Sequence, residues 1–437
     1  PLQVDTLKET KIPDQWDLQS CIDYAKEQNI TIRKNRITAA STQIDVKTAK
    51  AAMFPSLSFS TGQQVVNRPY QETSSRVSGS EIISSNSKTS YNGNYGLNAS
   101  WTLYNGNKRL KTIQQEKLNN QMAELDVATS ENNIQESIAQ VYIQILYAAE
   151  SVKVNENTLQ VSIAQRDRGQ ELLNAGSIAK SDLAQLEAQV STDRYQLVTA
   201  QATLEDYKLQ LKQLLELDGE NEMNIYLPTL SDENVLAPLP TKRDVYISAL
   251  SLRPEIEASK LNVEASELGI NIAKSSYFPT ISLSAGIGTN HTSGSDFTFG
   301  EQVKNGWNNS IGLSVSVPIF NNRQTKSAVQ KAKLQYETSM LSLLDEQKAL
   351  YKTIESLWLD ANSAQQRYAA ANEKLKSTQI SYELISEQFN LGMKNTVELL
   401  TEKNNLLQAQ QEQLQAKYMA ILNTQLLKFY QGDQLAL

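Results

Sequence analysis

Few side chains in this sequence could do chemistry by themselves. There is one cysteine, Cys21, and one histidine, His291, and they lie far apart in the chain. Cys21 shares a helical face with Leu18, Ile22 and Ala25, which predicts a buried thiol. His291 lies in a Gly/Ser-rich stretch and is predicted to be a solvated loop residue. The sequence has no nucleophile–base pair, metal-ligand cluster or glycine-rich phosphate loop, so we expect no enzyme activity, cofactor or metal site.

Two acids at matching places are more informative. Asp182 follows Gly176 by six residues, and Glu398 follows Gly392 by six. Each glycine fits the left-handed position after a helix, and each acid then falls in the first turn of the next helix, where the helix dipole favours negative charge. Helix capping is one interpretation. The other is a ring of carboxylates around the axis of an oligomer, which would select cations.

The charge balance argues against one class of partner. The 41 basic and 48 acidic residues give a formal net charge of −7 and form no basic block, so nucleic-acid binding is not expected. No run of about 18 apolar residues occurs, so a transmembrane helix is not expected either. A membrane could then be crossed only by a closed β-barrel.

The elements that would position the two acids are duplicated along the chain. The matching pairs are 49–60 with 273–284, 95–106 with 311–322, and 172–183 with 388–399. Each copy is predicted to contain a strand, a loop, a strand, a long helix, a tight glycine turn and a return helix.

Four segments alternate between apolar and polar residues with a period of two, which is typical of a two-faced strand. They lie near 56–60, 95–103, 281–287 and 311–319, with polar loops near 67–91 and 289–307. One face is almost entirely Ser, Gly, Asn and Thr, as in a water-filled lumen, although a strand of a soluble sandwich would also alternate. Aromatic residues at the strand ends predict an interfacial girdle. These are Phe54, Tyr104, Phe278, Phe320, Tyr91 and Trp307.

The remaining segments are predicted to be unusually long helices. From about Arg323 to Phe389 there is no Gly or Pro, and apolar residues follow an unbroken 4/3 spacing. The first copy follows the same rule, with the polar residue Asp193 in its seam. A heptad repeat of this kind indicates left-handed coiled-coil packing, and a helix from about 107 to 174 would reach about 100 Å.

Four strands per chain cannot close a barrel, and an open sheet in lipid would leave unpaired edges. Two chains would give a barrel filled by side chains, whereas three would give a pore wide enough for a polar lining. We therefore predict an α+β membrane protein with long coiled-coil α-helices and four β-strands per protomer, whose strands close as a 12-stranded β-barrel in a homotrimer. That the helices also form a long α-helical barrel is implied only by the family resemblance given next.

The segment LRPEIEASKLNVEASELGINIAKSSYFPTISL (252–283) resembles the TolC family of outer-membrane efflux and secretion channel proteins. The duplicated glycine turns, WTLYNGNKR and VPIFNNRQ resemble that family too, and the likeness covers about 20–430. It implies an exit duct in the outer membrane of a Gram-negative bacterium, in contact with lipid, with a helical tunnel in the periplasm. Its implied partners are a periplasmic adaptor (membrane fusion) protein and an inner-membrane transporter, in a tripartite efflux or type I secretion system.

The resemblance also implies roles for single residues. Gly176, Ser177, Gly392 and Met393 would form tip turns that dock the adaptor. The periplasmic aperture would contain Asp182, Glu398, Lys394, Phe389 and Thr401. Phe389 lacks the phenol donor usual in the family, so a charged constriction is expected but a hydrogen-bonded latch is not.

A trimeric coiled-coil fibre or adhesin is the alternative function. Because the sequence begins at Pro1 and Cys21 falls within a predicted helix, no lipid anchor is expected.

The expected division is an N-terminal equatorial segment (1–21), a helix toward the barrel (22–53), the first β-hairpin (54–104), the first long helical hairpin (105–216, tip near 174–182), an equatorial linker (217–245), a helix toward the barrel (246–277), the second β-hairpin (278–320), the second long helical hairpin (321–430, tip near 390–398) and a C-terminal tail (431–437).

Overall fold

The structure is a computed structural model that describes residues 12–70, 74–78, 81–85, 88–218, 223–228, 235–294 and 297–435. Parts of the expected N-terminal segment, first loop, linker and C-terminal tail therefore lie outside the described residues. The chain divides into two compact units. Unit 1 is drawn from 1–39, 122–259 and 342–437, and unit 2 from 40–121 and 260–341.

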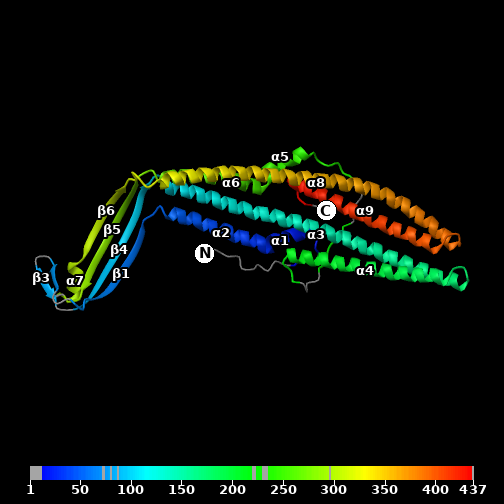
Figure 1. The fold of residues 1–437 in the computed structure, drawn as a ribbon, viewed down its shortest axis with the longest axis horizontal. Coiled ribbons are helices and arrows are strands. Elements are labelled where there is room, and N and C mark those ends of the chain that lie inside the picture. The colour runs from blue at the N-terminus through cyan, green and yellow to red at the C-terminus, as the bar shows by residue number, and fades with distance from the viewer. Residues whose placement is uncertain are drawn as a thin grey trace. The chain divides into compact units, whose positions relative to one another are not determined.

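Unit 2 contains one antiparallel sheet of four strands. In chain order the strands are β1 (Ser56–Asn67), β4 (Thr89–Asn105), β5 (Thr280–Thr292) and β6 (Asn308–Ser316). Their order in the sheet is β1-β4-β5-β6, so β4 joins the first hairpin to the second (Figure 1). All four predicted strands are present, and the four-stranded architecture per chain is confirmed.

The two predicted loops contain structure that the alternation pattern did not indicate. A short hairpin of β2 (Ser74–Ser78) and β3 (Glu81–Ser85) lies in the first, and α7 (Phe299–Asn305) lies in the second. The N-terminus of α7 is fixed by a reciprocal capping box, in which the Glu301 carboxylate accepts a hydrogen bond from the Thr298 amide at 2.9 Å. The sequence TFGE carries that capping signal, so this helix could have been predicted.

The sheet register collects the small polar residues on one face, because directly opposed residues of antiparallel strands point the same way. Three complete rows on this face are Ser56–Ser100–Ser284–Gly312, Ser58–Asn98–Gly286–Ser310 and Ser60–Gly96–Gly288–Asn308. Two rows on the other face are Leu57–Ala99–Ala285–Ile311 and Phe59–Leu97–Ile287–Asn309. The sheet therefore has an uncharged polar face and a mainly apolar face.

The chain leaves this sheet for the long helices through turns of the same backbone shape in both copies. Gly106 and Asn107 have φ values of 68° and 64°, and their counterparts Asn322 and Arg323 have 52° and 66°. A Cβ on Gly106 would lie 2.7 Å from the Ser275 carbonyl oxygen, so only glycine fits there. Arg109 adds a hydrogen bond to the Ala52 carbonyl at 3.0 Å.

The two longest helices match the spans expected at about 107–174 and 323–389, and each is followed by a return helix. In chain order these helices are α3 (Lys108–Asn174), α4 (Lys180–Leu214), α8 (Gln324–Asn390) and α9 (Thr396–Gln431). The shorter helices are α1 (Leu18–Gln28), α2 (Ile30–Ala51), α5 (Lys242–Leu252) and α6 (Pro254–Ser275). None of the helices in the described ranges combines the length and the apolar character that crossing a membrane requires.

Single helices were expected over 22–53 and 246–277, but each region contains two. Asn29 separates α1 from α2, and its side chain accepts a hydrogen bond from the Thr31 amide at 2.9 Å, which starts the second helix. Arg253 separates α5 from α6 because the residue before a proline, here Pro254, disfavours the helical backbone.

The core of unit 1 joins segments that are distant in sequence. Trp16 donates its amide to the Asn224 carbonyl at 2.8 Å, and the Tyr226 amide donates to the Trp16 carbonyl at 2.8 Å. Val235 and Leu435 belong to the same buried cluster. The described parts of the N-terminal segment, linker and tail therefore pack together.

The predictions for Cys21 and His291 have different outcomes. Cys21 is fully buried in this core, as predicted, and burial raises the pKa of its thiol to about 12. The prediction for His291 is wrong. It lies in β5, where its ring stacks on Tyr95 and meets Phe299 of α7 edge-on, because α7 supplies a neighbour that the loop was not expected to contain.

Candidate functional site

The helix-to-helix turns are the candidate site, and both lie at the same end of unit 1 (Figure 1). In the first turn the Ser177 amide donates to the Leu172 carbonyl at 2.8 Å and the Gly176 amide to the Leu173 carbonyl at 2.9 Å. In the second, Met393 donates to Gln388 at 2.8 Å and Gly392 to Phe389 at 2.9 Å. Both are Schellman motifs with a left-handed glycine, at φ 73° and 75°.

The return helix of the second turn starts with a complete capping box. The Glu398 amide donates to the Asn395 side-chain oxygen at 2.9 Å, and the Asn395 amide donates to the Glu398 carboxylate at 3.2 Å. Lys394 also donates to the other Glu398 oxygen at 2.6 Å. The Lys394 ammonium, followed by the Asn395 amide, lowers the pKa of Glu398 below its ordinary value.

The first turn is chemically simpler. The Ala179 amide donates to the Asp182 carboxylate at 3.0 Å, but Ala179 has no polar side chain to complete the box. The residue before it is Ile178, where the second copy has Lys394. The capping interpretation thus applies to both acids, and of the two, Glu398 is the one with a described ion pair at its own turn.

Two further residues of the expected aperture are placed differently from the acids. Phe389 is buried, with 4% of its surface exposed, so its ring packs inside unit 1. Thr401 is exposed, and its hydroxyl donates to the Val397 carbonyl of its own helix at 2.7 Å.

The surfaces of the two turns also differ. Leu391 and Met393 beside the second glycine are 74% and 71% exposed, and Val397 is exposed as well. The corresponding positions of the first turn are Ala175, Ser177 and Ser181. The second tip is therefore apolar and the first is small and polar.

The aromatic residues expected to form a girdle lie at the ends of the sheet strands. Phe54, Phe278, Phe320, Tyr91 and Trp307 are all exposed. Tyr104 is half-buried and lies opposite Ile281 because a bulge between Thr102 and Tyr104 shifts the register. The bulge puts Tyr104 on the apolar face, which simple alternation did not predict.

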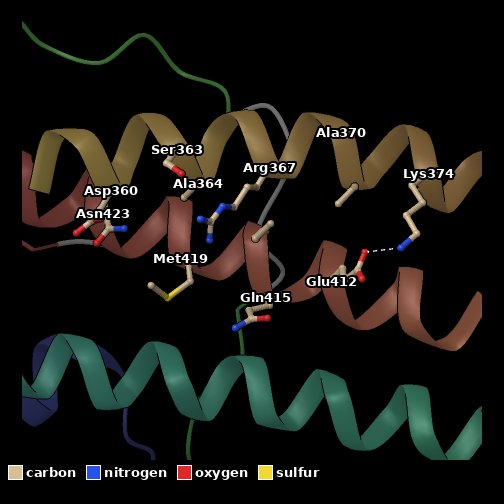
Figure 2. A pocket seen from close by; sticks show the side chains of 12 residues that line it. Asp360, Ser363, Ala364, Arg367, Ala370, Lys374, Glu412, Gln415, Met419 and Asn423 are labelled. Carbon is tan, nitrogen blue, oxygen red and sulfur yellow. Dashed lines mark hydrogen bonds and ion pairs between the residues drawn. The ribbon is translucent and has the colours of Figure 1, made fainter.

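A groove between α8 and α9 in unit 1 has a volume of about 600 Å³ (Figure 2). It exists because Ala364, Ala371 and Ala416 leave space between the helices. Lys374 and Glu412 form an ion pair at 2.7 Å near one end, as the dashed line in Figure 2 shows.

Sequence reasoning found only one member of a buried polar cluster further along the helices. Asp193, expected as a polar residue in the α4 seam, forms an ion pair with Lys403 of α9, and both contact the Ser162 hydroxyl of α3. The Gln189 amide donates to the second Asp193 oxygen at 2.8 Å.

Comparison with known proteins identifies the class. The sequence profile described as "Outer membrane efflux protein" matches residues 21–216 and 245–432. The chain therefore belongs to the outer membrane efflux protein family, as its sequence predicted. The family consists of transport proteins of the outer membrane, which places the chain there.

Individual relatives are distant but consistent. The chain is 24% identical over 294 residues to the outer membrane efflux protein BepC of Brucella suis, covering 67% of this chain and 61% of that protein. It is also 24% identical over 296 residues to the outer membrane protein TolC of Escherichia coli, covering 65% and 58%. The chain thus spans about three fifths of the length of these relatives.

The fold matches solved structures over nearly the whole chain. A crystal structure of CusC aligns with a TM-score of 0.80 at 19% identity, covering 95% of this chain and 92% of the other. VceC of Vibrio cholerae aligns with a TM-score of 0.78 at 16% identity, covering 96% and 97%. The predicted fold of long helices with four strands per chain is confirmed.

Proposed function

We propose that three copies of this chain form an exit duct that carries substrates out across the outer membrane. The observation that carries the proposal is the sheet, with one uncharged polar face, one mainly apolar face and two edge strands. Among the described residues, β1 and β6 each have only one neighbouring strand. An unpaired edge in lipid costs several kcal/mol for each unsatisfied backbone group, so β6 of one copy would pair with β1 of the next.

Three copies would close a barrel of twelve strands, with Ser, Gly and Asn inside and the apolar face toward lipid. The aromatic residues at the strand ends would lie at the two lipid–water interfaces. They are Phe54, Phe278, Phe320, Tyr91 and Trp307, which are exposed, and Tyr104, which is half-buried. The long helices would then extend the duct into the periplasm.

The end of the helices near Gly176 and Gly392 is proposed as the periplasmic aperture. Three copies of Asp182 and Glu398 would place six carboxylates there, and exposed Thr401 would lie on the same helix as Glu398. Lys394 already pairs with Glu398, which makes Asp182 the main source of negative charge. Because Phe389 is buried, its proposed contribution is to hold α8 in place below the turn.

The turns themselves are proposed to dock a periplasmic adaptor protein that is fed by an inner-membrane transporter. Ser177 and Met393, which follow the two glycines, would present unlike surfaces to it. Relatives bear names such as "Toxin and drug export protein A" and "Alkaline protease secretion protein AprF", which support both efflux and secretion as roles.

The test is reconstitution of the purified full chain. In planar bilayers a trimer should form an ion-conducting pore, and cell fractionation should place the protein with detergent-extracted outer membrane. A fibre or adhesin would give neither result, and a monomer that keeps its β-structure without conductance would refute the barrel.

A further inference from the structure

The buried polar cluster joins helices from both copies of the duplication. Lys403 and Asp193 have side chains only 3% and 2% exposed, and Ser162 is buried with them. The Lys403 ammonium donates to the Asp193 carboxylate and to the Ser162 hydroxyl, and that hydroxyl donates to the same carboxylate oxygen. One cluster therefore connects α9 to both helices of the first hairpin, α3 and α4.

Buried apolar residues lie within about one to two turns of the cluster on the same helices, and Gln189 is a polar neighbour that donates to Asp193 at 2.8 Å. Leu186 and Val190 precede Asp193 on the same face of α4, Leu399 lies one turn before Lys403 on α9, and all three are buried. Burial lowers the pKa of Lys403, while the neighbouring Asp193 carboxylate opposes that shift. If α9 slid or rotated away, the Lys403 ammonium and the Asp193 carboxylate would lose their ion pair while Asp193 stayed buried with only neutral partners, which is strongly unfavourable.

The duplication shows that the fold does not require this cluster. The positions equivalent to Ser162, Asp193 and Lys403 in the other copy are Thr378, Ala409 and Glu187. Ala409 is fully buried without any charge, and the Thr378 hydroxyl donates to the Lys374 carbonyl of its own helix at 2.6 Å. The other copy therefore has no ion pair at the equivalent positions.

The remaining described ties nearer the turns are weaker. Gln165 of α3 donates to the Tyr382 hydroxyl of α8 at 2.7 Å, and Gln189 of α4 donates to Asn404 of α9 at 3.3 Å. Both are single hydrogen bonds between neutral groups, and the second is exposed. The charged cluster is thus the strongest described polar link between the two hairpins on this side of the core.

We propose that Ser162, Asp193 and Lys403 form a lock that holds α9 against the first hairpin and restrains widening of the end that carries the two glycine turns. Lys403 lies about 12 Å along α9 from the turn, at roughly 1.5 Å per residue, so a small displacement there is transmitted directly to the tip. The lock rests on the proposed channel function, because restraint matters only where a tip must open.

The test removes the ion pair without leaving a buried unpaired charge. The double variant Lys403→Met with Asp193→Asn is neutral at both positions, and such replacements of buried ion pairs are often tolerated. The matched control is Lys374→Met with Glu412→Gln, which neutralises an ion pair of similar type that is 46% and 42% exposed and lies within the second hairpin alone. The charge-swapped variant, Lys403→Asp with Asp193→Lys, tests whether the pairing itself matters.

We expect the lock variant to insert as a trimer and to show a mean conductance at least threefold above the parent in planar bilayers. The control variant should have the same conductance as the parent. The conductance of the charge-swapped variant should lie between those of the parent and the lock variant. Hydrogen exchange of α9 around Lys403 should be faster in the lock variant only. If the lock variant cannot be purified as a trimer, Ser162→Ala should give a smaller change in the same direction.

The outcomes separate the two proposals. A parent without any conductance would overturn the channel function, and the lock would then be judged on hydrogen exchange alone. If the parent conducts and the lock variant has the same conductance and hydrogen exchange as the parent, the lock is overturned and the channel function stands. Where the lock variant cannot be purified, the same comparison is made with Ser162→Ala.

Discussion

Replacing Gly392 by alanine tests whether the tip turns depend on a left-handed backbone alone. A Cβ on Gly392 would have no atom within 4 Å, so the substitution meets no steric obstacle in the protomer. The residue nevertheless has φ 75°, which costs an ordinary L-residue about 1–2 kcal/mol. Reduced flexibility of the open chain offsets about 0.4–1 kcal/mol of that cost, so we expect a net local loss of about 1 kcal/mol.

A loss of about 1 kcal/mol raises the open population of the turn about fivefold. The amides of Gly392 and Met393, which donate to the Phe389 and Gln388 carbonyls, should then exchange about fivefold faster. The measurement is hydrogen exchange by mass spectrometry on the tip peptides of the intact protein. Gly176→Ala should behave in the same way, because its φ is 73° and its surroundings are equally open.

The chain supplies a matched control for this experiment. A Cβ on Gly300 would likewise have no atom within 4 Å, but the backbone of this residue is not in the left-handed region. Gly300→Ala should therefore leave exchange unchanged or slow it, since alanine favours the helix there. Gly392→Asn should cost less than Gly392→Ala, because asparagine tolerates this conformation. Equal effects of Gly392→Ala and Gly300→Ala would refute the reasoning.

The remaining predictions concern assembly, docking and charge. Light scattering corrected for bound detergent should give about three times 48.7 kDa, and a monodisperse monomer would contradict closure by three copies. Gly176→Val or Gly392→Val should leave insertion normal and lower transport through the full complex, whereas unchanged transport at equal abundance would remove both glycines from docking. Asp182→Asn should reduce both cation selectivity and block by multivalent cations. The double variant Lys394→Met with Glu398→Gln should have a smaller effect, because the ion pair that it removes has no net charge. Equal effects would contradict the proposal that Asp182 is the main source of negative charge at the aperture. In an Asp182→Asn background the pKa of Glu398, held below its ordinary value by Lys394, leaves the carboxylate ionised from pH 7 to 5. The pairing with Lys394 is lost only as the pH falls through that lowered pKa. Selectivity of this variant should be flat from pH 7 to 5, and a transition within that range would be inconsistent with the shift.

The sequence predicts the regular parts of this fold because their signals are local and repeated. The absence of Gly and Pro between the flanking turns placed the ends of α3 and α8 to within about one residue, and heptad spacing indicated coiled-coil helix between those ends. Alternation gave the polar and apolar faces of the sheet. The bulge that turns Tyr104 to the apolar face was not predicted, because one extra residue in a strand leaves no periodic signal. Gly176 and Gly392 were recognised because a left-handed turn needs a specific residue type.

The side-chain chemistry at the site was less accessible. Asp193 was visible as a polar residue in a seam, but its partner Lys403 is 210 residues away. Lys403 falls three residues after Leu400, in a heptad seam position, so two opposite charges in seams were the available signal. Which seams meet is decided by tertiary packing, and no local pattern reports it.

The two copies have kept the backbone of the site and changed its side chains. Left-handed residues recur at 106 and 322, at 107 and 323, and at 176 and 392, so the turns are held by the geometry of the chain. The charges follow no such rule. Asp182 stands beside Ile178, whereas Glu398 is paired with Lys394, and the lock occurs in one register only. Reversing the chain requires only the shared backbone of the two turns, so their side chains can differ. In a trimer the tip would alternate two kinds of turn. One is small and polar with a capping carboxylate, and the other is apolar with an acid paired to Lys394.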